Sequence, residues 1–276
     1  MMDINYQQCA ALIDYADGLL ITAGAGMGVD SGLPDFRGTE GFWKAYPALA
    51  NAGIHFQTIA SPESFRSHPR LAWGFYGHRL NLYRRTLPHD GFRILLELAD
   101  SMPRGAFVFT SNVDGQFQKA GFRDAEICEV HGSIHHMQCL NGCAGDIWPA
   151  RNFEPVVDEE QCLLTGVLPT CPHCGCLARP NIVMFSDGEW LDFRQEIQKT
   201  ALRQWLSRVE RPVVIELGAG TSIPTVRMIG QQIDGPMIRI NPRESQVSRK
   251  TDIGLPVAAL EGLMGIATAL AAAERS

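Results

Sequence analysis

The chain has 276 residues, 45% of them hydrophobic and 20% charged, which is typical of a soluble globular protein with one large domain, alone or with a small module. Its formal net charge of −6 argues against a general nucleic-acid binder, which is usually basic. The N-terminus lacks the pattern of a signal peptide, and no run of about 18 apolar residues is present. We therefore expect a cytoplasmic protein without a membrane span.

The first predicted elements surround a glycine-rich turn. Residues 6–17 are typical of a helix, and the apolar run 18–22 has the length of a buried strand. Gly24, Gly26 and Gly28 follow, and glycines allow a backbone to approach a ligand closely. A strand, a glycine turn and a helix start present free N–H groups to a phosphate.

The residues after this turn argue against an ordinary dehydrogenase. Val29 stands where the dinucleotide fingerprint has its third glycine, and no second strand with an acidic end follows about 20 residues on. Instead, a carboxylate, an aromatic ring and a guanidinium lie within Pro34-Asp35-Phe36-Arg37. Such a cluster suits a site that binds the nicotinamide half of NAD and cleaves the bond between nicotinamide and ribose. It has no obvious use in hydride transfer.

Helices and strands alternate along the rest of the chain. Residues 38–59 lack a clear period and predict a mobile loop with short helical turns, whereas Ser61 before Pro62 is typical of a helix start. Further helices are predicted at 70–85, 88–99 and 194–208, strands at 106–110, 125–130, 212–217 and 236–240, and a packed apolar helix within 255–273. This alternation predicts a doubly wound parallel sheet.

Small or polar residues end four of the predicted strands. They are Gly24, Asn112, Gly220 and Asn241. Ligands of open α/β sheets bind outside the carboxyl ends of the strands. We therefore expect these four positions to converge on one crevice.

The cysteines predict a structural metal site. Eight cysteines in a chain without a secretion signal favour reduced or metal-bound thiols over disulfides. Cys139-x3-Cys143 and Cys171-x2-Cys174 form two close pairs that match a tetrahedral zinc site, and four thiolates leave no position for a catalytic water. The metal would then stabilise a segment, 139–180, with little core of its own. The competing ligands are His173, His135, His136, Cys176 and Cys162, and the other alternative is free thiols in a loop-rich segment.

Seven motifs, in one order along the chain, resemble those of the sirtuin family of NAD-dependent protein deacylases. They are the glycine turn, Pro34-Asp35-Phe36-Arg37 within Ser-Gly-Leu-Pro-Asp-Phe-Arg-Gly, Asn112-x-Asp114, His131-Gly132, the four cysteines, Gly220-Thr221-Ser222 and Ile240-Asn241. The resemblance covers nearly the whole chain and implies an α/β fold: a Rossmann-like doubly wound parallel sheet with a small helical module and a small inserted zinc-binding module. Residues 1–48, 90–137 and 182–276 would form the Rossmann-like NAD-binding domain, residues 49–89 the helical module and residues 138–181 the zinc-binding module.

The resemblance also implies an activity. It is the NAD-dependent removal of acyl groups from lysine in a protein or peptide, releasing nicotinamide and O-acyl-ADP-ribose, with NAD as co-substrate and zinc as a structural metal. His131 matches the general base, and a pKa near neutrality suits it to take a proton from a ribose hydroxyl. Asn112 would orient the ribose or a water, and Phe36 would shield the cation-like centre. The residues implied to bind NAD are Gly24, Ala25, Gly26, Asp35, Phe36, Arg37, Asn112, Asp114, Gly220, Thr221, Ser222 and Asn241.

Three residues are implied to bind the acyl-lysine. Val183 lies in a stretch that resembles the strand on which the acyl-lysine peptide docks. Tyr76 and Arg79 form a Tyr-x-x-Arg pair, which in one sirtuin branch binds the distal carboxylate of succinyl- or malonyl-lysine. On a helix these two positions share a face, and Arg makes charge-assisted, bidentate bonds to a carboxylate. The alternative is that Arg79 is one of several exposed arginines and Tyr76 a core aromatic.

The chain departs from the sirtuin pattern at three places. Ser111 stands where the family usually has Gln, Gly28 where it usually has Ser, and residues 185–189 replace a shorter Phe-Gly-Glu. These changes keep two other functions open, an ADP-ribosyltransferase or NAD glycohydrolase on the same scaffold, and a non-enzymatic sensor of NAD or ADP-ribose. The presence of His131 argues against the sensor, which has no need for a base.

Overall fold

A six-stranded parallel sheet organises the larger part of the molecule. The computed structural model describes all residues except 1, 36–37, 274 and 276. The strand order is β11-β10-β9-β1-β2-β3, and every neighbouring pair is parallel. The strands are β1 (Gly18–Ala23), β2 (Ala106–Thr110), β3 (Ile127–Glu129), β9 (Pro212–Leu217), β10 (Met237–Ile240) and β11 (Ile253–Leu255). The predicted doubly wound sheet is confirmed.

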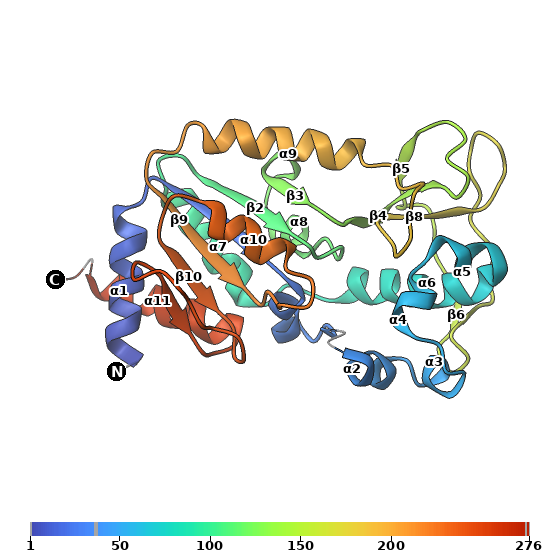
Figure 1. Cartoon of the computed structure of the whole chain (residues 1–276), viewed down its shortest axis with the longest axis horizontal. Coiled ribbons are helices and arrows are strands. Elements are labelled where there is room, and N and C mark those ends of the chain that lie inside the picture. The colour runs from blue at the N-terminus through green and yellow to red at the C-terminus, as the bar shows by residue number, and fades with distance from the viewer. Residues whose placement is uncertain (1, 36–37, 274, 276) are drawn as a thin grey trace.

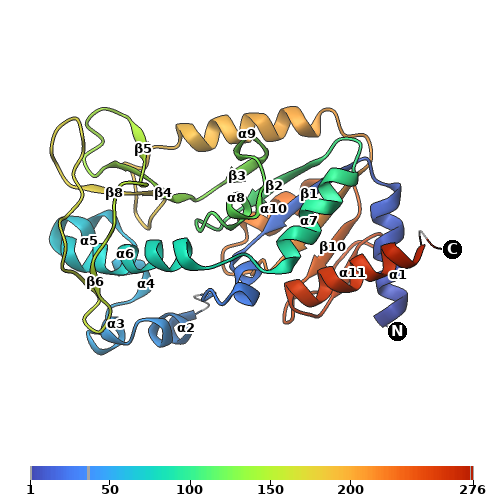
Figure 2. The same cartoon turned by 180° about the vertical axis from the view of Figure 1, so that it is seen from behind.

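Helices cover both faces of this sheet, which explains why its strands are continuous apolar runs. Helices α1 (Met2–Tyr15), α7 (Asp90–Ser101) and α11 (Ala259–Ala273) pack on one face, seen from the front in Figure 2. Helices α9 (Phe193–Leu206) and α10 (Thr225–Gln232) pack on the other, seen in Figure 1. Side chains of β1 alternate between the two cores, because Leu19 and Ile21 join the first and Leu20 the second.

A second lobe lies at the end of the molecule away from both termini (Figure 1). Its helices are α2 (Gly38–Ala45), α3 (Pro47–Asn51), α4 (Phe56–Ile59), α5 (Pro62–Ser67) and α6 (Pro69–Arg85), and its three-stranded antiparallel sheet is formed by β5 (Ile147–Pro149), β4 (Gly132–Cys139) and β8 (Ala178–Ile182). A hairpin of β6 (Val157–Asp158) and β7 (Leu163–Leu164) lies against α6. One hydrophobic core joins these parts, with Phe42, Trp73 and Tyr76 from helices and Met137 from β4.

Most predicted elements are present, and the differences have local causes. Ser61 caps α5 as predicted, because its Oγ accepts the N–H of Ser64 at 3.2 Å. The stretch 38–59 holds three short helices, whose four to eight residues are too few to show a helical period. The remaining short elements are the 3-10 helices η1 (Ala25–Ser31) and η2 (Asp124–Glu126) and the helix α8 (Gln116–Ala120).

Helix α10 and the strands β4, β5, β6, β7 and β11 were not predicted. Both α10 and β11 are short. β4 begins at Gly132, where a predicted strand was expected to end, and β3 already ends at Glu129. His131 therefore lies in the turn between two strands. Within the described residues, no helix is both long and apolar enough to cross a membrane.

Candidate active site

A cavity of about 530 Å³ lies between the two lobes, at the carboxyl ends of β1, β2 and β9. It is lined by most of the residues predicted for the site: Gly24, Ala25, Asp35, Tyr76, Arg79, Asn112, Asp114, His131, Val183, Gly220, Thr221 and Ser222. Gly26 and Asn241 do not line it. Phe36 and Arg37 lie outside the described residues. Of the four strand-end positions expected to converge on one crevice, the structure brings Gly24, Asn112 and Gly220 to this cavity, whereas Asn241 is buried behind it.

Glycines allow the loops after β1 and β9 to touch at the base of the cavity. The N–H of Gly26 donates to the carbonyl of Gly218 at 3.1 Å. Gly218 has φ +57°, and a Cβ there would lie 2.3 Å from the carbonyl carbon of Gly26. A Cβ on Gly24 would lie 2.8 Å from the Cα of Ala219. Gly26 therefore shapes the site by backbone contact and lies behind the cavity wall.

Asn112 is held rigidly at the end of β2. Its Nδ2 donates to the carbonyl of Gly24 at 3.0 Å, and its own N–H donates to Oγ1 of Thr110 at 3.0 Å. Thr110 Oγ1 in turn donates to the carbonyl of Ala23 at 2.9 Å. The side-chain amide is thereby held by the residue after β1 and the backbone of Asn112 by the end of β2, so the amide is oriented before any ligand binds.

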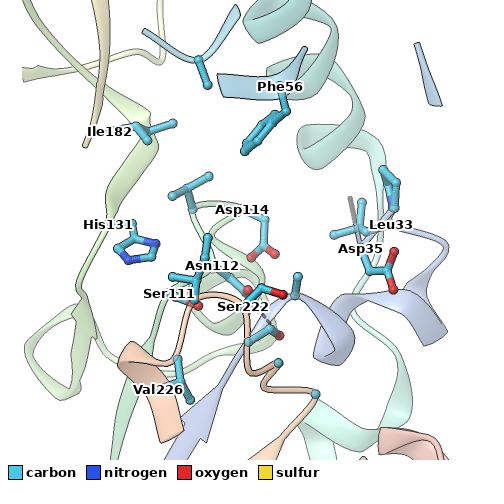
Figure 3. A pocket seen from close by; sticks show the side chains of 18 of the residues that line it. Leu33, Asp35, Phe56, Ser111, Asn112, Asp114, His131, Ile182, Ser222 and Val226 are labelled. Carbon is cyan, nitrogen blue, oxygen red and sulfur yellow. Dashed lines mark hydrogen bonds between the residues drawn. The ribbon is translucent and has the colours of Figure 1, made fainter. Parts of the chain in front are cut away.

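His131 stands on the same wall of the cavity as Ser111 and Asn112 (Figure 3). Its carbonyl accepts the N–H of Val183 at 3.0 Å, which ties this turn to the segment after β8. Burial lowers the pKa of the imidazole below its usual 6.5, and a hydrogen bond to the backbone of Ser111 partly opposes this shift. His131 is consequently neutral at pH 7, the form that can accept a proton.

Asp114 points into the cavity (Figure 3). Its Oδ1 accepts the N–H of Gln116 at 2.9 Å. Burial raises the pKa of the carboxyl to about 6, with a smaller opposing effect from that hydrogen bond. The backbone carbonyl of Asp114 accepts a hydrogen bond from Nε2 of His135 at 2.9 Å, so His135 supports this turn from outside the cavity.

The loop Gly218–Ser222 is held by the loop that follows β10 and by Arg227 of α10. The carbonyl of Ala219 accepts a hydrogen bond from Nδ2 of Asn241 at 2.9 Å and two from Arg227, at 3.0 and 3.2 Å. Asn241 is fully buried, and its Oδ1 accepts the N–H groups of Arg243 and Glu244. Asn241 therefore joins two loops instead of facing the cavity.

Glu244 lines the cavity and was not identified from the sequence. Its Oε1 accepts the hydroxyl of Thr221 at 2.8 Å, and its carbonyl accepts from Arg227 at 2.7 Å. An acidic side chain beside a nucleotide site commonly accepts hydrogen bonds from ribose hydroxyls. The sequence feature that could have indicated Glu244 is its position three residues after Asn241, which directly follows a strand.

Helix α6 supplies a cationic pocket with aromatic walls. Arg79 and Tyr76 are 7% and 1% exposed, yet both line the cavity. The guanidinium lies 5.2, 5.6 and 5.4 Å from the ring centres of Phe75, Tyr76 and Tyr83, within the range of cation–π attraction. Arg79 is thus neither an exposed surface arginine nor separated from Tyr76. Tyr83, a further lining residue, was missed, although its i+4 position from Arg79 was a signal.

The loop after β8 is anchored by a fully buried ion pair. Arg179 donates from Nη1 and Nη2 to the two carboxylate oxygens of Asp187 at 2.8 and 2.7 Å, and neither side chain is exposed. The same carboxylate accepts the N–H of Met184 at 3.1 Å. Val183, Met184 and Phe185 line the cavity, and the N–H of Phe185 donates to the carbonyl of Ala60. This contact joins the loop to the helical side of the lobe.

The four predicted metal ligands lie together. The Sγ atoms of Cys139, Cys143, Cys171 and Cys174 are all within 4.8 Å of one another. Two of these separations are 3.7 and 3.6 Å, close to the edge of about 3.8 Å that a tetrahedron has when its Zn–S bonds are about 2.3 Å. The thiolate set therefore fits a structural zinc ion, and it lies outside the cavity.

Comparison with known proteins identifies the family. The Sir2 family model matches residues 24–223, so the chain belongs to the Sir2 family, and the resemblance to sirtuins is confirmed. A protein of Thermococcus kodakarensis named NAD-dependent protein deacylase is 31% identical over 250 residues, 88% of this chain and 87% of that protein. One of Pyrococcus abyssi with the same name is 32% identical and covers 84% of each chain.

Solved structures show the same fold. A Sir2 homologue in complex with NAD has a TM-score of 0.70 at 24% identity, over 96% of this chain and 93% of that chain. A mutant Sir2 homologue in complex with ADP-ribose has a TM-score of 0.71 at 24% identity, over 97% of each chain.

Proposed function

We propose that the protein is an NAD-dependent protein-lysine deacylase, which transfers the acyl group of an acyl-lysine to ADP-ribose and releases nicotinamide. The observation that carries this proposal is the meeting of His131, Asn112 and Asp114 in one cavity with the Gly220–Ser222 loop and the Arg79 pocket. The names of the relatives, NAD-dependent protein deacylases, support the same conclusion.

The cavity offers a place for each part of NAD. The backbone N–H groups of Gly220, Thr221 and Ser222 and the hydroxyl of Ser222 would bind the phosphates. Asn112 would hold the nicotinamide ribose, and Asp114 would accept from the carboxamide. NAD itself supplies the ribose carbon whose bond to nicotinamide is broken. Ala25 and Asp35 would complete the nicotinamide end, and Asn241 would act through the loops that it joins.

His131 is the group suited to move a proton. The neutral imidazole would take a proton from a ribose hydroxyl, which then attacks the acyl carbon. The position of His131 on the cavity wall beside Asn112, which would hold the nicotinamide ribose, supports this role (Figure 3). Val183, bonded through its N–H to the carbonyl of His131, would contact the acyl-lysine.

We further propose that the acyl group is acidic, a succinyl or malonyl group. Arg79 is a buried cation at the cavity wall, and a ligand carboxylate would make charge-assisted hydrogen bonds to such a guanidinium. An acetyl group offers no such partner.

The test is to incubate the protein with NAD and acetyl-, succinyl- or unmodified lysine peptides. Nicotinamide release is measured by chromatography and deacylation by peptide mass. We expect nicotinamide release in step with deacylation, and none with the unmodified peptide. Release without deacylation would instead support an NAD glycohydrolase, and transfer of ADP-ribose to the peptide an ADP-ribosyltransferase, the alternatives that Ser111 at the cavity wall keeps in view.

Two variants assign the roles. His131→Ala should lower deacylation by about 10²–10⁴-fold, whereas the exposed His68→Ala should leave it unchanged.

Arg79→Met should lower the ratio of succinyl to acetyl turnover, whereas Arg93→Met, a change at a side chain 61% exposed, should keep the ratio. An unchanged ratio in Arg79→Met would overturn the acidic-acyl proposal and leave the deacylase proposal intact.

A further inference from the structure

Tyr83 engages the same guanidinium as the proposed acyl pocket. It lies one turn after Arg79 on α6, and its hydroxyl oxygen accepts hydrogen bonds from Nε at 3.0 Å and from Nη2 at 2.8 Å. Its side chain is 5% exposed and lines the cavity. These two bonds use one edge of the guanidinium, the edge through which Arg commonly binds a carboxylate in bidentate fashion.

The hydroxyl group of Tyr83 can donate its proton to a ligand. An oxygen that accepts two hydrogen bonds from one guanidinium must direct its own O–H away from that group. Among the described residues, none accepts a hydrogen bond from this hydroxyl. Burial raises the pKa of Tyr83 above 10.0, with Arg79 opposing, so the proton is present at neutral pH.

Tyr76 presents a second hydroxyl in the same pocket. The ring of Tyr76 is also 5.6 Å from the guanidinium, and the residue is 1% exposed and lines the cavity. Two tyrosines and one cation thus line the same part of the cavity wall. A neutral acyl group offers these donors no charged acceptor, whereas a carboxylate accepts from several at once.

We infer that Tyr83 is a third acyl-binding residue, which donates its hydroxyl proton to the distal carboxylate of an acidic acyl group while fixing the orientation of Arg79. This inference rests on the proposed deacylase function. The acyl carboxylate is then bound by the O–H of Tyr83, the O–H of Tyr76 and the charge of Arg79, and is not bound bidentately at the Nε edge. Selectivity for acidic acyl groups accordingly depends on Tyr83 as well as on the Tyr-x-x-Arg pair.

The test compares full-length wild type and Tyr83→Phe with succinyl-lysine and acetyl-lysine peptides at saturating NAD. Loss of one hydrogen bond to a charged group predicts a rise of about ten- to a hundredfold in the succinyl-peptide KM. The ratio of succinyl to acetyl kcat/KM should fall by the same factor. Tyr15→Phe, at a side chain 73% exposed, is the matched control and should keep both the KM and the ratio.

A purely structural role for Tyr83 predicts a different result. If the hydroxyl only supports α6, Tyr83→Phe lowers both activities alike and keeps their ratio, and the inference is then wrong. Tyr83→Gln, whose amide can both accept from Arg79 and donate to a carboxylate, should restore part of the ratio and serves if the Phe variant does not fold. Wild type that turns over no acylated peptide would overturn the deacylase proposal itself, an outcome distinct from active enzyme with an unaltered ratio.

A matched ligand pair tests the carboxylate without any substitution. Succinamyl-lysine replaces the distal carboxylate of succinyl-lysine by a neutral amide of nearly the same shape. Wild type should prefer the succinyl peptide by about tenfold or more, and Tyr83→Phe should narrow this preference. Equal turnover of the two peptides by wild type would overturn the inference.

Discussion

Burial in the cavity shifts the pKa values of Asp114 and His131 in opposite directions. In both cases the charged form loses hydration, so the pKa of the carboxyl rises to about 6 and that of the imidazole falls below 6.5. Above pH 6 the two groups are therefore an ionised acceptor and a neutral base. This combination suits the proposed roles of Asp114 at the carboxamide and His131 at the ribose.

Asp114 makes a testable contribution to stability against pH. Its folded-state pKa lies above its usual 3.8, so the folded protein holds this proton more tightly than the unfolded chain does. The contribution is most favourable below about pH 4 and is lost as pH rises through 6. Asp114→Asn should therefore raise the free energy of unfolding at pH 7.5 by about 3 kcal/mol, and by much less at pH 4.5, while lowering nicotinamide release.

Urea unfolding at the two pH values measures this difference. Asp14→Asn, at an exposed carboxylate, is the control and should show no such pH-dependent gain. An equal gain in unfolding free energy at both pH values would contradict the conclusion that burial raises the pKa of Asp114.

Gly218 tests the contact between the loops after β1 and β9. Gly218→Ala would have to accommodate both φ +57° and a Cβ 2.3 Å from a backbone carbon. Gly53→Ala has a similar φ, +67°, and nothing within 4 Å of the added carbon, so it isolates the conformational cost of about 1 kcal/mol. We expect the Gly218 variant to be less stable than the Gly53 variant and to weaken NAD binding at least tenfold, measured by calorimetry. Similar NAD affinity in both variants would contradict the role of Gly218 in the close contact between the two loops.

At the scale of elements, β4 and β8 connect the four cysteines to the cavity. Cys139 ends β4, whose first residue, Gly132, follows His131. β8 pairs with β4 in an antiparallel ladder and leads directly into Val183. A metal ion that fixes one end of this ladder therefore stabilises the strands that position the base and the acyl-lysine segment at the other end.

Removal of the metal should lower the stability of the fold, because the metal has no direct part in the reaction. Wild type is expected to contain one zinc ion per chain by elemental analysis, and Cys143→Ser should lose it and melt at a lower temperature by several degrees. Cys176→Ser, a change at an exposed cysteine of the same segment outside the cluster, should retain the metal. Loss of zinc in Cys176→Ser would show that the ligand set is wrong.

The Arg179–Asp187 pair has a comparable role for the loop after β8. Asp187→Asn leaves the buried guanidinium of Arg179 opposite a neutral amide, which should cost about 3 kcal/mol of unfolding free energy. Because Asp187 also accepts the N–H of Met184, the peptide KM should rise more than the NAD KM. Asp234→Asn, at an exposed position, is the control, and equal increases in both KM values would contradict a role in peptide docking.

At the scale of the whole molecule, the cavity lies where two separately packed lobes meet. The sheet lobe supplies Gly24, Asn112 and the Gly218–Ser222 loop, and the second lobe supplies Tyr76, Arg79 and Val183. The nucleotide and the acyl-lysine are thus expected to enter from different lobes and to react at their junction. Figure 1 shows that the two lobes are arranged end to end, with the β4–β8 sheet extending from the sheet lobe into the second lobe.

The sequence by itself determined the parallel sheet, the four-cysteine set and most of the polar side chains that line the cavity. Buried strands are recognisable as predominantly apolar runs such as 106–110 and 212–217, and the carboxyl ends of parallel strands in a doubly wound sheet share one edge. These features depend on local patterns and on a topology with few alternatives, so the order of residues was sufficient to predict them.

Only the tertiary structure decided which polar groups face the cavity and which support it. Asn241 joins two loops from within the core, while Glu244 and Tyr83 reach the cavity without matching any of the motifs used to predict the site. The directions of their side chains depend on contacts between segments far apart in the chain, such as Asn241 with Ala219 or the lobe core around α6. Such contacts leave no periodic pattern in the sequence, because each one depends on how distant segments pack against each other within a lobe.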